Sequence, residues 1–321
     1  MYLNFNRVKM FNGYKICEVA DVLLYRKSKI SRGEQFDDGR KLALIIEGGS
    51  IRGIGSSGFA KSLSLSGYTN CFDTIYATSA GALNAVYFVT DDCDTAMSIY
   101  YDDATSKNCT NFWNFPDILD VDWLLEAIIF NEKSFDVDYV KNKSKPIIVA
   151  VSRASDGKVK YFNLGKLNEI EIENVLKATA YTPLLSSKTS FIQGEYYVDG
   201  LIEGALPIDR AISDGCTHAV CLLTHEYGFR KHTGPLLGAL ERLRLIRRNK
   251  AFRNRYMKTN FYYNNSIDII YGNHNSSIPT LTFNPLKSHK IPRVSGDQAL
   301  VKKFGENCYT EGMRLLEEMQ K

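Results

Sequence analysis

The chain has 321 residues, of which 44% are hydrophobic and 12% aromatic, and its formal net charge is +4 at pH 7. This composition is typical of a globular protein with a substantial core, and so small a charge does not indicate a nucleic-acid partner. The longest apolar runs, such as LALII and AVCLL, are far shorter than a bilayer span, and the N-terminus lacks the pattern of a secretory signal.

Seven cysteines are scattered along the chain, without a CxxC pair or a Cys/His cluster of metal-ligand spacing. An odd number at such spacing favours reduced thiols over a disulfide framework or structural zinc. We therefore expect a cytoplasmic protein that uses no metal and no other cofactor.

The regular pattern of the chain begins after a mostly polar N-terminal extension, residues 1–40. Residues 41–49, KLALIIEGG, predict a buried strand that ends in glycines, and residues 58–67 have the spacing of a helix that closes at Gly67. Residues 72–90 then predict a strand, a tight turn and a helix.

Two further apolar runs, residues 145–153 and 218–225, predict strands that are covered on both faces, because neither alternates with polar residues. Residues 171–181 and 207–215 have helical patterns. Strands interleaved with helices indicate a mainly parallel sheet between helical layers, a three-layer α/β/α sandwich. Catalytic groups in such folds lie at the carboxyl ends of strands.

The basic segment, residues 242–258, carries eight basic residues and no acidic one. Apolar residues recur every three positions here and just upstream, which predicts an amphipathic helix with a basic outer side; these residues are Leu237, Leu240, Leu243 and Ile246. Such a face is either simply solvated or makes peripheral contact with an anionic membrane. We expect residues 236–321 to form a C-terminal helical segment packed on a core of residues 41–235.

Ser79 falls where the run FDTIYA ends and the run AGALNAVYFV begins. A strand-to-helix turn projects the hydroxyl of such a serine, as in the GxSxG nucleophile elbow, and the flanking residues must be small. Gly81 fits this pattern, and Ala77 is small but lacks the freedom of glycine to take a positive φ, so a slight strain is expected there. The alternative is a serine that only caps the helix.

The stretch EGGSIRG, residues 47–53, lies upstream of this serine. Glycines at the end of a buried strand let consecutive backbone N–H groups point at one spot, which suits a developing oxyanion or a phosphate. The phosphate-loop pattern GxxxxGK[ST] is absent and the GxGxxG spacing does not fit, so acyl transfer is favoured. Downstream, Asp199 and Gly200 follow a predicted strand, from which a carboxylate could reach a serine; an Asp-Gly pair is also typical of a plain turn.

In this order and spacing, the three pieces resemble the motifs of the patatin-like phospholipases. The GGGx[RK]G strip of that family corresponds here to residues 48–53, its elbow to 77–81 and its DG[GA] motif to 199–201. The resemblance covers residues 22–319. The chain departs from the family pattern at three positions, where Ser50 replaces the third strip glycine, Ala77 the first elbow glycine and Leu201 a small residue.

The resemblance implies a Ser79–Asp199 dyad that needs no histidine. Asp199 takes the proton from the Ser79 hydroxyl, which attacks an acyl carbonyl. The oxyanion is then held by backbone amides of the strip, namely Gly48, Gly49 and Ser50.

The same resemblance assigns Arg52 to orienting the strip or meeting an anionic head group, with a structural salt bridge as the alternative. His225, just past a strand end, is expected near the site but not as a triad base. The main hypothesis is a serine acyl hydrolase that cleaves lipid or another acyl ester. An acyltransferase with an amine or alcohol acceptor and a patatin-like pseudoenzyme that binds an acyl ligand remain as alternatives.

Overall fold

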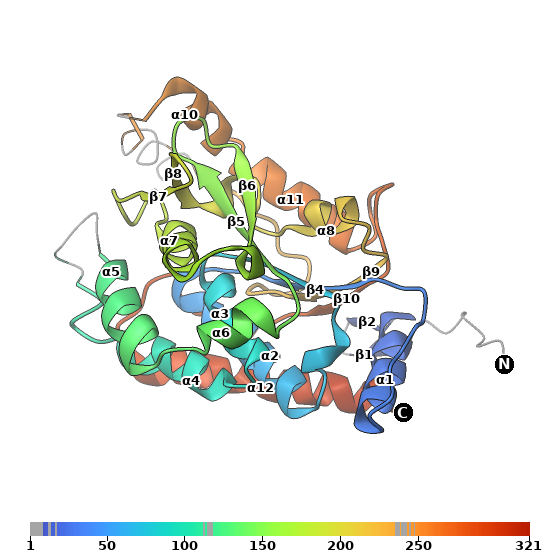
Figure 1. Cartoon of the computed structure of the whole chain (residues 1–321). Helices are drawn as coiled ribbons and strands as arrows, with labels where there is room; N and C mark the ends of the chain where they lie inside the picture. Colours follow the sequence, from blue (N-terminus) through green and yellow to red (C-terminus); the bar gives the residue numbers. More distant parts are fainter. Residues whose placement is uncertain are drawn as a thin grey trace.

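The computed structural model describes residues 9–11, 14–16, 18–111, 113, 118–234, 238, 243, 245–246 and 248–321. An eight-stranded sheet lies at its centre, and a small hairpin of β1 (Lys9–Phe11) and β2 (Tyr14–Ile16) forms a separate sheet (Figure 1). None of the described helices is long and apolar enough to cross a membrane.

The central sheet has the strand order β10-β9-β3-β4-β5-β8-β7, and β6 also pairs with β5. Its five parallel strands are β10 (Thr280–Phe283), β9 (His218–Leu222), β3 (Leu42–Ile46), β4 (Thr74–Thr78) and β5 (Ile147–Arg153). The strands β8 (Glu195–Asp199), β7 (Ser190–Ile192) and β6 (Val159–Asn163) join antiparallel at one side. The expected mainly parallel sheet is therefore confirmed.

Helices cover both faces of this sheet, which confirms the three-layer α/β/α sandwich (Figure 1). The first face carries α1 (Glu18–Ser31), α2 (Gly53–Leu65), α3 (Ala80–Val89), α4 (Cys93–Ser98), α5 (Val121–Trp123), α6 (Val137–Asn142), α7 (Glu169–Ala180) and α12 (Gln298–Met319). The second face carries α8 (Ile208–Ser213) and α11 (Thr259–Ile270). Two π-helical segments, Ile99–Asp103 and Leu124–Glu132, continue α4 and α5.

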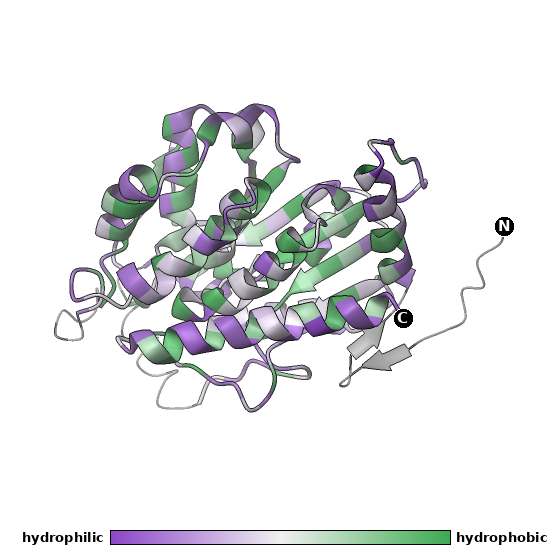
Figure 2. Cartoon of the chain, turned by 90° about the horizontal axis from the view of Figure 1, so that it is seen from below, coloured by the Kyte–Doolittle hydropathy of each residue, from purple (hydrophilic) through white to green (hydrophobic). Residues whose placement is uncertain are grey.

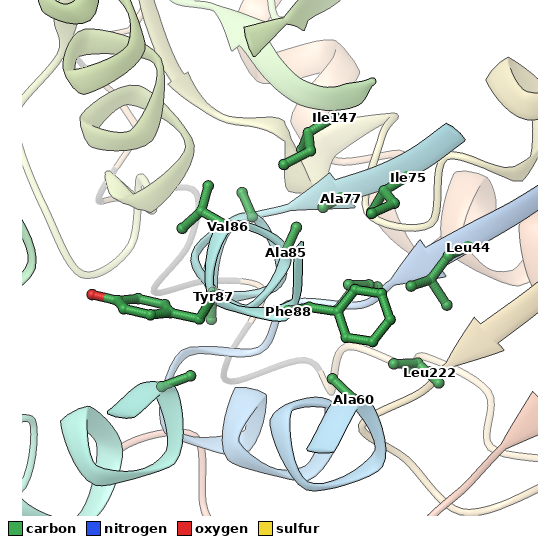
Figure 3. Packing of buried hydrophobic residues seen from close by; sticks show 14 of the residues in the cluster. Leu44, Ala60, Ile75, Ala77, Ala85, Val86, Tyr87, Phe88, Ile147 and Leu222 are labelled. Carbon is green, nitrogen blue, oxygen red and sulfur yellow. The ribbon is translucent and has the colours of Figure 1, made fainter. Parts of the chain in front are cut away.

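Side-chain alternation along β3 explains why both faces are covered. Leu44 and its alternate neighbours belong to the main core on the first face, whereas Ala43 and Ile45 belong to the core beneath α8 and α11. Successive strand residues point to opposite faces, so an unbroken apolar run requires two helical layers. Figure 3 shows the first core around α3, with Phe88 near Leu44 of the sheet and Ala60 of α2.

The long C-terminal helix α12 packs along α2. Figure 2 shows hydrophilic and hydrophobic residues alternating along α12, and its buried side includes Val301, Phe304, Cys308 and Leu315. Because α2 begins at Gly53, this packing also fixes the end of the glycine-rich strip, residues 47–53.

Residues 18–40 contain a helix that the sequence analysis did not predict. Val19 and Leu23 of α1 are fully buried in the main core. Arg26, only 1% exposed, forms ion pairs with Asp38 at 2.8 Å and with Asp73 at 2.7 Å. The division of the chain at residues 40 and 235 stays a prediction.

The basic segment differs from the expected amphipathic helix. Its described helix, α10 (Lys250–Tyr256), begins only after Asn249, whose side chain accepts a hydrogen bond from the Ala251 N–H. Leu243 and Ile246, expected to face the core, are 65% and 61% exposed. Both residues lie before this helix begins, so the three-residue period did not describe one continuous amphipathic helix over residues 242–258.

Other residues of the segment pack against the body of the protein. Leu245, Phe252 and Tyr256 are buried against the end of β8, and Arg255 forms an ion pair with Glu203, so it does not lie on a free basic face. Several residues of the expected pattern lie outside the described part of the chain, namely Leu237, Leu240, Arg242, Arg244 and Arg247.

Candidate active site

Ser79 lies in the turn between β4 and α3, with φ of 57° and ψ of −136°. A positive φ is uncommon for a residue with a Cβ, and at a strand-to-helix turn it lifts the side chain away from the helix. The Ser79 side chain makes no capping hydrogen bond to α3, so the plain cap is not what the geometry favours.

The neighbours of Ser79 form a tight elbow. A Cβ added to Gly81 would lie 2.3 Å from the Ile46 carbonyl oxygen, so only glycine fits there. The strain expected at Ala77 was placed wrongly: Ala77 lies inside β4, is fully buried and is not among the described residues with positive φ. The strained backbone is at Ser79 itself and at Ser50, whose φ is 55°.

The glycine-rich strip runs beside this elbow. A Cβ on Gly48 would meet the Thr78 carbonyl oxygen at 2.4 Å, which shows how closely the two turns pack. The backbone N–H groups of Gly49 and Ser50 have no hydrogen-bond partner among the residues that the structure describes. These two donors are therefore available to a ligand, as an oxyanion hole requires.

Asp199 ends β8 and is almost completely buried. Its Oδ2 accepts a hydrogen bond from the Thr182 hydroxyl at 2.6 Å, and its Oδ1 accepts one from the Leu201 N–H at 3.0 Å. The Ser79 side chain lines the same cavity and lies close enough to lower the pKa of this carboxylate. Burial raises the pKa of Asp199 above its usual range, and these hydrogen bonds act in the opposite direction. A carboxylate of raised pKa is a stronger base. Gly200 begins the turn that follows.

Ser79 and Asp199 open into a polar cavity of about 420 Å³. Three basic side chains line it together with them: Arg52, Lys231 and Arg293. The sequence pointed to Arg52 but not to Lys231 or Arg293, which lie far along the chain in segments without a motif. No ion pair engages Arg52 within the described residues, so a structural salt bridge is not what holds it.

Glu47 anchors the start of the strip, a role that the sequence did not reveal. Its Oε2 accepts a hydrogen bond from the Thr224 N–H at 2.6 Å and its Oε1 accepts one from the Tyr263 hydroxyl at 3.0 Å. Burial raises the pKa of Glu47, while the Thr224 N–H and the charge of Lys231 lower it. The carboxylate thus ties the strip to β9 and α11.

His225 lines the polar cavity, but its surroundings do not favour a base. Its ring stacks on Phe229 with 3.7 Å between centroids. Burial, and then the charges of Arg52, Lys231 and Arg293, lower the pKa of His225 to about 2. Its imidazole therefore stays neutral at ordinary pH.

An apolar pocket of about 800 Å³ meets the polar cavity at Ser50, Ser79 and Thr182. One wall is a single face of α3, from Ala80 to Tyr87, which follows the helix for about 10 Å. The remaining wall comes mainly from the π-helical segments and α7 and includes Ile99, Ala104, Leu125, Ile129 and Ala180. Sequence periodicity marked none of these residues as pocket-lining, because pocket and core residues are equally apolar.

No group of three or more His, Cys, Asp or Glu side chains in the described ranges is arranged to hold a metal ion. Six cysteines in the described part of the chain are buried free thiols: Cys71, Cys93, Cys109, Cys216, Cys221 and Cys308.

The chain is similar to two known proteins and matches one family model. "Uncharacterized protein YjjU" of Escherichia coli (strain K12) is 27% identical over 195 residues, which cover 59% of this chain and 53% of that protein, so the match spans about half the length of this relative. The crystal structure of VipD from Legionella pneumophila aligns with a TM-score of 0.38 and 13% identity, over 87% of this chain and 67% of VipD. The family model described as patatin-like phospholipase matches residues 44–212, more than half of the chain. The chain therefore belongs to the patatin-like phospholipase family.

Proposed function

We propose that this protein is a serine acyl hydrolase of lipid or other acyl esters, with Ser79 as nucleophile and Asp199 as base. The observation that carries the proposal is that Ser79 and Asp199 line the same polar cavity, with Ser79 at its junction with an apolar pocket. Membership of the family supports lipid acyl hydrolysis at the family level. The apolar pocket suits an acyl chain, and the polar cavity suits the alcohol part of the ester.

In the proposed reaction, Asp199 accepts the proton of the Ser79 hydroxyl while Oγ bonds to the acyl carbonyl carbon. The resulting oxyanion accepts hydrogen bonds from the N–H groups of Gly49 and Ser50. The intermediate then collapses, the ester C–O bond breaks, and the leaving alcohol takes the proton from Asp199. Water attacks the acyl-enzyme with Asp199 again as base, which releases the acid and restores Ser79.

Two features support preorganisation of this site. The positive φ of Ser79 is fixed by the fold before substrate binds, so no backbone rearrangement is needed. Ser79 also stands at the N-terminus of α3, where the helix dipole favours developing negative charge. Gly81 and Gly200 contribute by permitting the tight turns on either side of the dyad.

The acyltransferase alternative uses the same acyl-enzyme and differs only in the acceptor, an amine or alcohol in place of water. The pseudoenzyme alternative keeps the apolar pocket but forms no covalent intermediate. These three functions differ in whether Ser79 becomes acylated and in which product is released.

The test is intact-mass analysis after exposure to a fluorophosphonate probe. We expect one adduct per chain on Ser79, none in Ser79→Ala, and an unchanged adduct in Ser213→Ala, a matched change at an exposed serine. An unlabelled wild-type protein that is folded by circular dichroism would refute the proposal and leave the pseudoenzyme. Product analysis with a long-chain ester, with and without an added alcohol, separates hydrolysis from transfer.

Peripheral contact with an anionic membrane through residues 242–258 is part of the proposal. The exposure of Leu243 and Ile246 beside basic residues supports it, because such side chains can enter the headgroup region of a bilayer. Ile246→Gln and Arg253→Gln should each weaken sedimentation with phosphatidylserine vesicles, and salt should weaken it in the wild type. Equal sedimentation of wild type and both variants would show that the segment is a solvated surface that does not bind the membrane.

A further inference from the structure

Three cations converge on the polar cavity without carboxylates of their own. Arg52, Lys231 and Arg293 line the cavity, and no ion pair of the described residues engages any of them. The Nε of Arg52 is buried without a hydrogen-bond partner. Like charges brought together in such a cavity repel one another, and Glu47 and Asp199 offset this repulsion only in part, so the cavity favours an entering anion.

The two carboxylates of the cavity are already engaged elsewhere. Glu47 accepts hydrogen bonds from the Thr224 N–H and the Tyr263 hydroxyl, and Asp199 accepts its own from the Thr182 hydroxyl and the Leu201 N–H. Burial first, and then the charge of Arg293, lower the pKa of Lys231 to about 8, although the charge of Glu47 acts in the opposite direction. The cavity therefore holds three cations against two carboxylates that are engaged in other hydrogen bonds.

A side cavity of about 630 Å³ continues from this point. It shares Leu201, Lys231 and Arg293 with the polar cavity and is otherwise lined by residues around α10 and α11, among them Tyr256, Met257 and Asn260. The apolar pocket contains neither Lys231 nor Arg293. An ester whose acyl chain fills the apolar pocket therefore directs its alcohol part toward these two cations.

Contacts with residues near the glycine-rich strip position both Lys231 and Arg293. The Lys231 N–H donates to Asn264 Oδ1 at 2.8 Å, and the Asn264 amide donates back to the Lys231 carbonyl at 3.1 Å. The Lys231 ammonium lies 4.5 Å from the centre of the Tyr263 ring. The Arg293 carbonyl accepts the Ile51 N–H at 3.2 Å, next to the oxyanion donor of Ser50.

We propose that Lys231 and Arg293 bind a phosphate monoester group on the alcohol part of the substrate, so that the protein selects phosphorylated acyl esters over neutral ones. The proposal rests on the proposed function, since Ser79 must receive the acyl group. A phosphate monoester carries nearly two negative charges and three acceptor oxygens, which match a guanidinium and an ammonium side by side. A zwitterionic head group would place its own cation against this basic wall.

The test compares two esters that differ only in the phosphate, 1-oleoylglycerol 3-phosphate and 1-oleoylglycerol. We expect a higher kcat/KM for the phosphate ester in the wild type. Lys231→Met and Arg293→Met should each lower the ratio of the two kcat/KM values at least about tenfold, the loss of one charge-assisted hydrogen bond. Lys231→Arg and Arg293→Lys should keep most of the ratio, and Lys287→Met, an exposed change in the same C-terminal region, should leave it unaltered.

Equal kcat/KM values for the two esters in the wild type, or a ratio unchanged in both methionine variants, would overturn the proposal. Calorimetric titration of Ser79→Ala with 1-oleoylglycerol 3-phosphate separates this failure from failure of the proposed function. One informative combination is that Ser79→Ala binds this ester and Ser79→Ala/Lys231→Met fails to bind it, while the wild type shows no turnover. That combination would support the phosphate subsite and refute the proposed hydrolase activity. Inorganic phosphate that binds as tightly as the ester, with the same dependence on Lys231, would assign the site to free phosphate and overturn the substrate assignment.

Discussion

The hydroxyl of Thr179 accepts a hydrogen bond from the backbone N–H of Ser79 at 2.7 Å. It donates in turn to the Ala150 carbonyl at 2.9 Å, and the Thr179 side chain is fully buried. The elbow between β4 and α3 is thus held to β5 through α7. A residue 100 positions away in the chain fixes the strained conformation of the proposed nucleophile.

Replacing this threonine tests whether elbow geometry limits turnover. Thr179→Val keeps the shape but leaves the buried Ser79 N–H unpaired, which costs about 1–3 kcal/mol. We expect kcat for a short chromogenic ester to fall about tenfold to a hundredfold, with a smaller change in KM and slower fluorophosphonate labelling. Thr179→Ser should restore both rates, and wild-type kcat in a folded Thr179→Val would show that the bond does not position Ser79.

The apolar pocket predicts a limit on acyl-chain length. Ile129 lines the pocket four residues before Lys133, whose carbonyl accepts the Tyr87 hydroxyl, so it lies at the Tyr87 end of the α3 face. Ile129→Phe should fill this end and lower the ratio of kcat/KM for a hexadecanoyl ester to that for a butanoyl ester about tenfold. Ile129→Leu, which conserves volume, should keep the ratio. The same loss in both variants would point to general disruption of the core.

The pH dependence of kcat/KM should differ between neutral and phosphate esters. For both, activity falls as pH drops through the pKa of Asp199, because the protonated carboxyl cannot take the Ser79 proton; burial places this limb above the usual carboxylate range. The phosphate ester should also lose activity as pH rises past about 8, where Lys231 loses its charge.

The charges that face Lys231 are those of Arg293, Glu47, Arg52 and Asp199. The pKa of Lys231 lies at about 8, so we assign the alkaline limb of the phosphate ester to this group. Lys231→Arg should abolish the alkaline limb of the phosphate ester and leave the pH profile of the neutral ester as it was. Retention of the limb in this variant would assign it to another group.

The buried ion-pair cluster of α1 predicts a large stability effect remote from the site. Arg26→Met removes the partner of Asp38 and Asp73, so we expect a loss of about 3–5 kcal/mol in the free energy of unfolding, measured with urea. Burial tends to raise the pKa of Asp38, but hydrogen bonding to Arg26 holds it below its usual value. Ionised Asp38 therefore stabilises the fold above its unfolded pKa, and this contribution disappears as pH falls through its folded pKa. Arg26→Met should lack that acid-dependent loss, and a stability equal to wild type would contradict the assignment.

Local patterns explain what the sequence predicted well. The strand, serine and helix of residues 74–89 are contiguous, so apolar runs and small residues were sufficient to place Ser79 at a strand end. The helix α1 was missed because its buried positions, such as Val19 and Leu23, are few among polar residues. Its ion pairs with Asp38 and Asp73 depend on tertiary contacts that no local pattern encodes.

The phosphate-facing cations could not be predicted for the same reason. Lys231 and Arg293 lie in irregular segments without a motif, and only the fold brings them to the strip. The resemblance supplied the order of the motifs, but the cavity on which substrate choice depends is built by α10, α11 and the segment before α12. The assignment of Ser79 and Asp199 as a dyad stays a prediction until the covalent adduct is measured.

Two of the three departures from the family pattern, Ser50 and Ala77, have different physical consequences. Ser50 takes a φ of 55° and lines both the apolar pocket and the polar cavity. Ala77 is fully buried inside β4 and lines neither, so its methyl group packs in the main core. Replacement by glycine should therefore change activity on a long-chain ester at Ser50 and the free energy of unfolding at Ala77.

A left-handed conformation costs a residue with a Cβ about 1–2 kcal/mol, and Ser50→Gly relieves this strain. The greater backbone entropy of glycine in the unfolded state offsets about 0.5–1 kcal/mol of the gain in stability. We expect the free energy of unfolding to stay level or rise slightly, and kcat for a short ester to remain within about threefold, because the Gly49 and Ser50 amides already stand unpaired at the site. Activity on the long-chain ester should fall, since the Ser50 hydroxyl borders both cavities. Ala77→Gly should instead lower stability by about 1 kcal/mol, through a lost buried methyl group and added chain entropy, with both activities preserved. A tenfold or larger gain in short-ester kcat for Ser50→Gly would show that the natural serine holds the oxyanion donors out of line, and that the protein is a weakened hydrolase and not a specialised one.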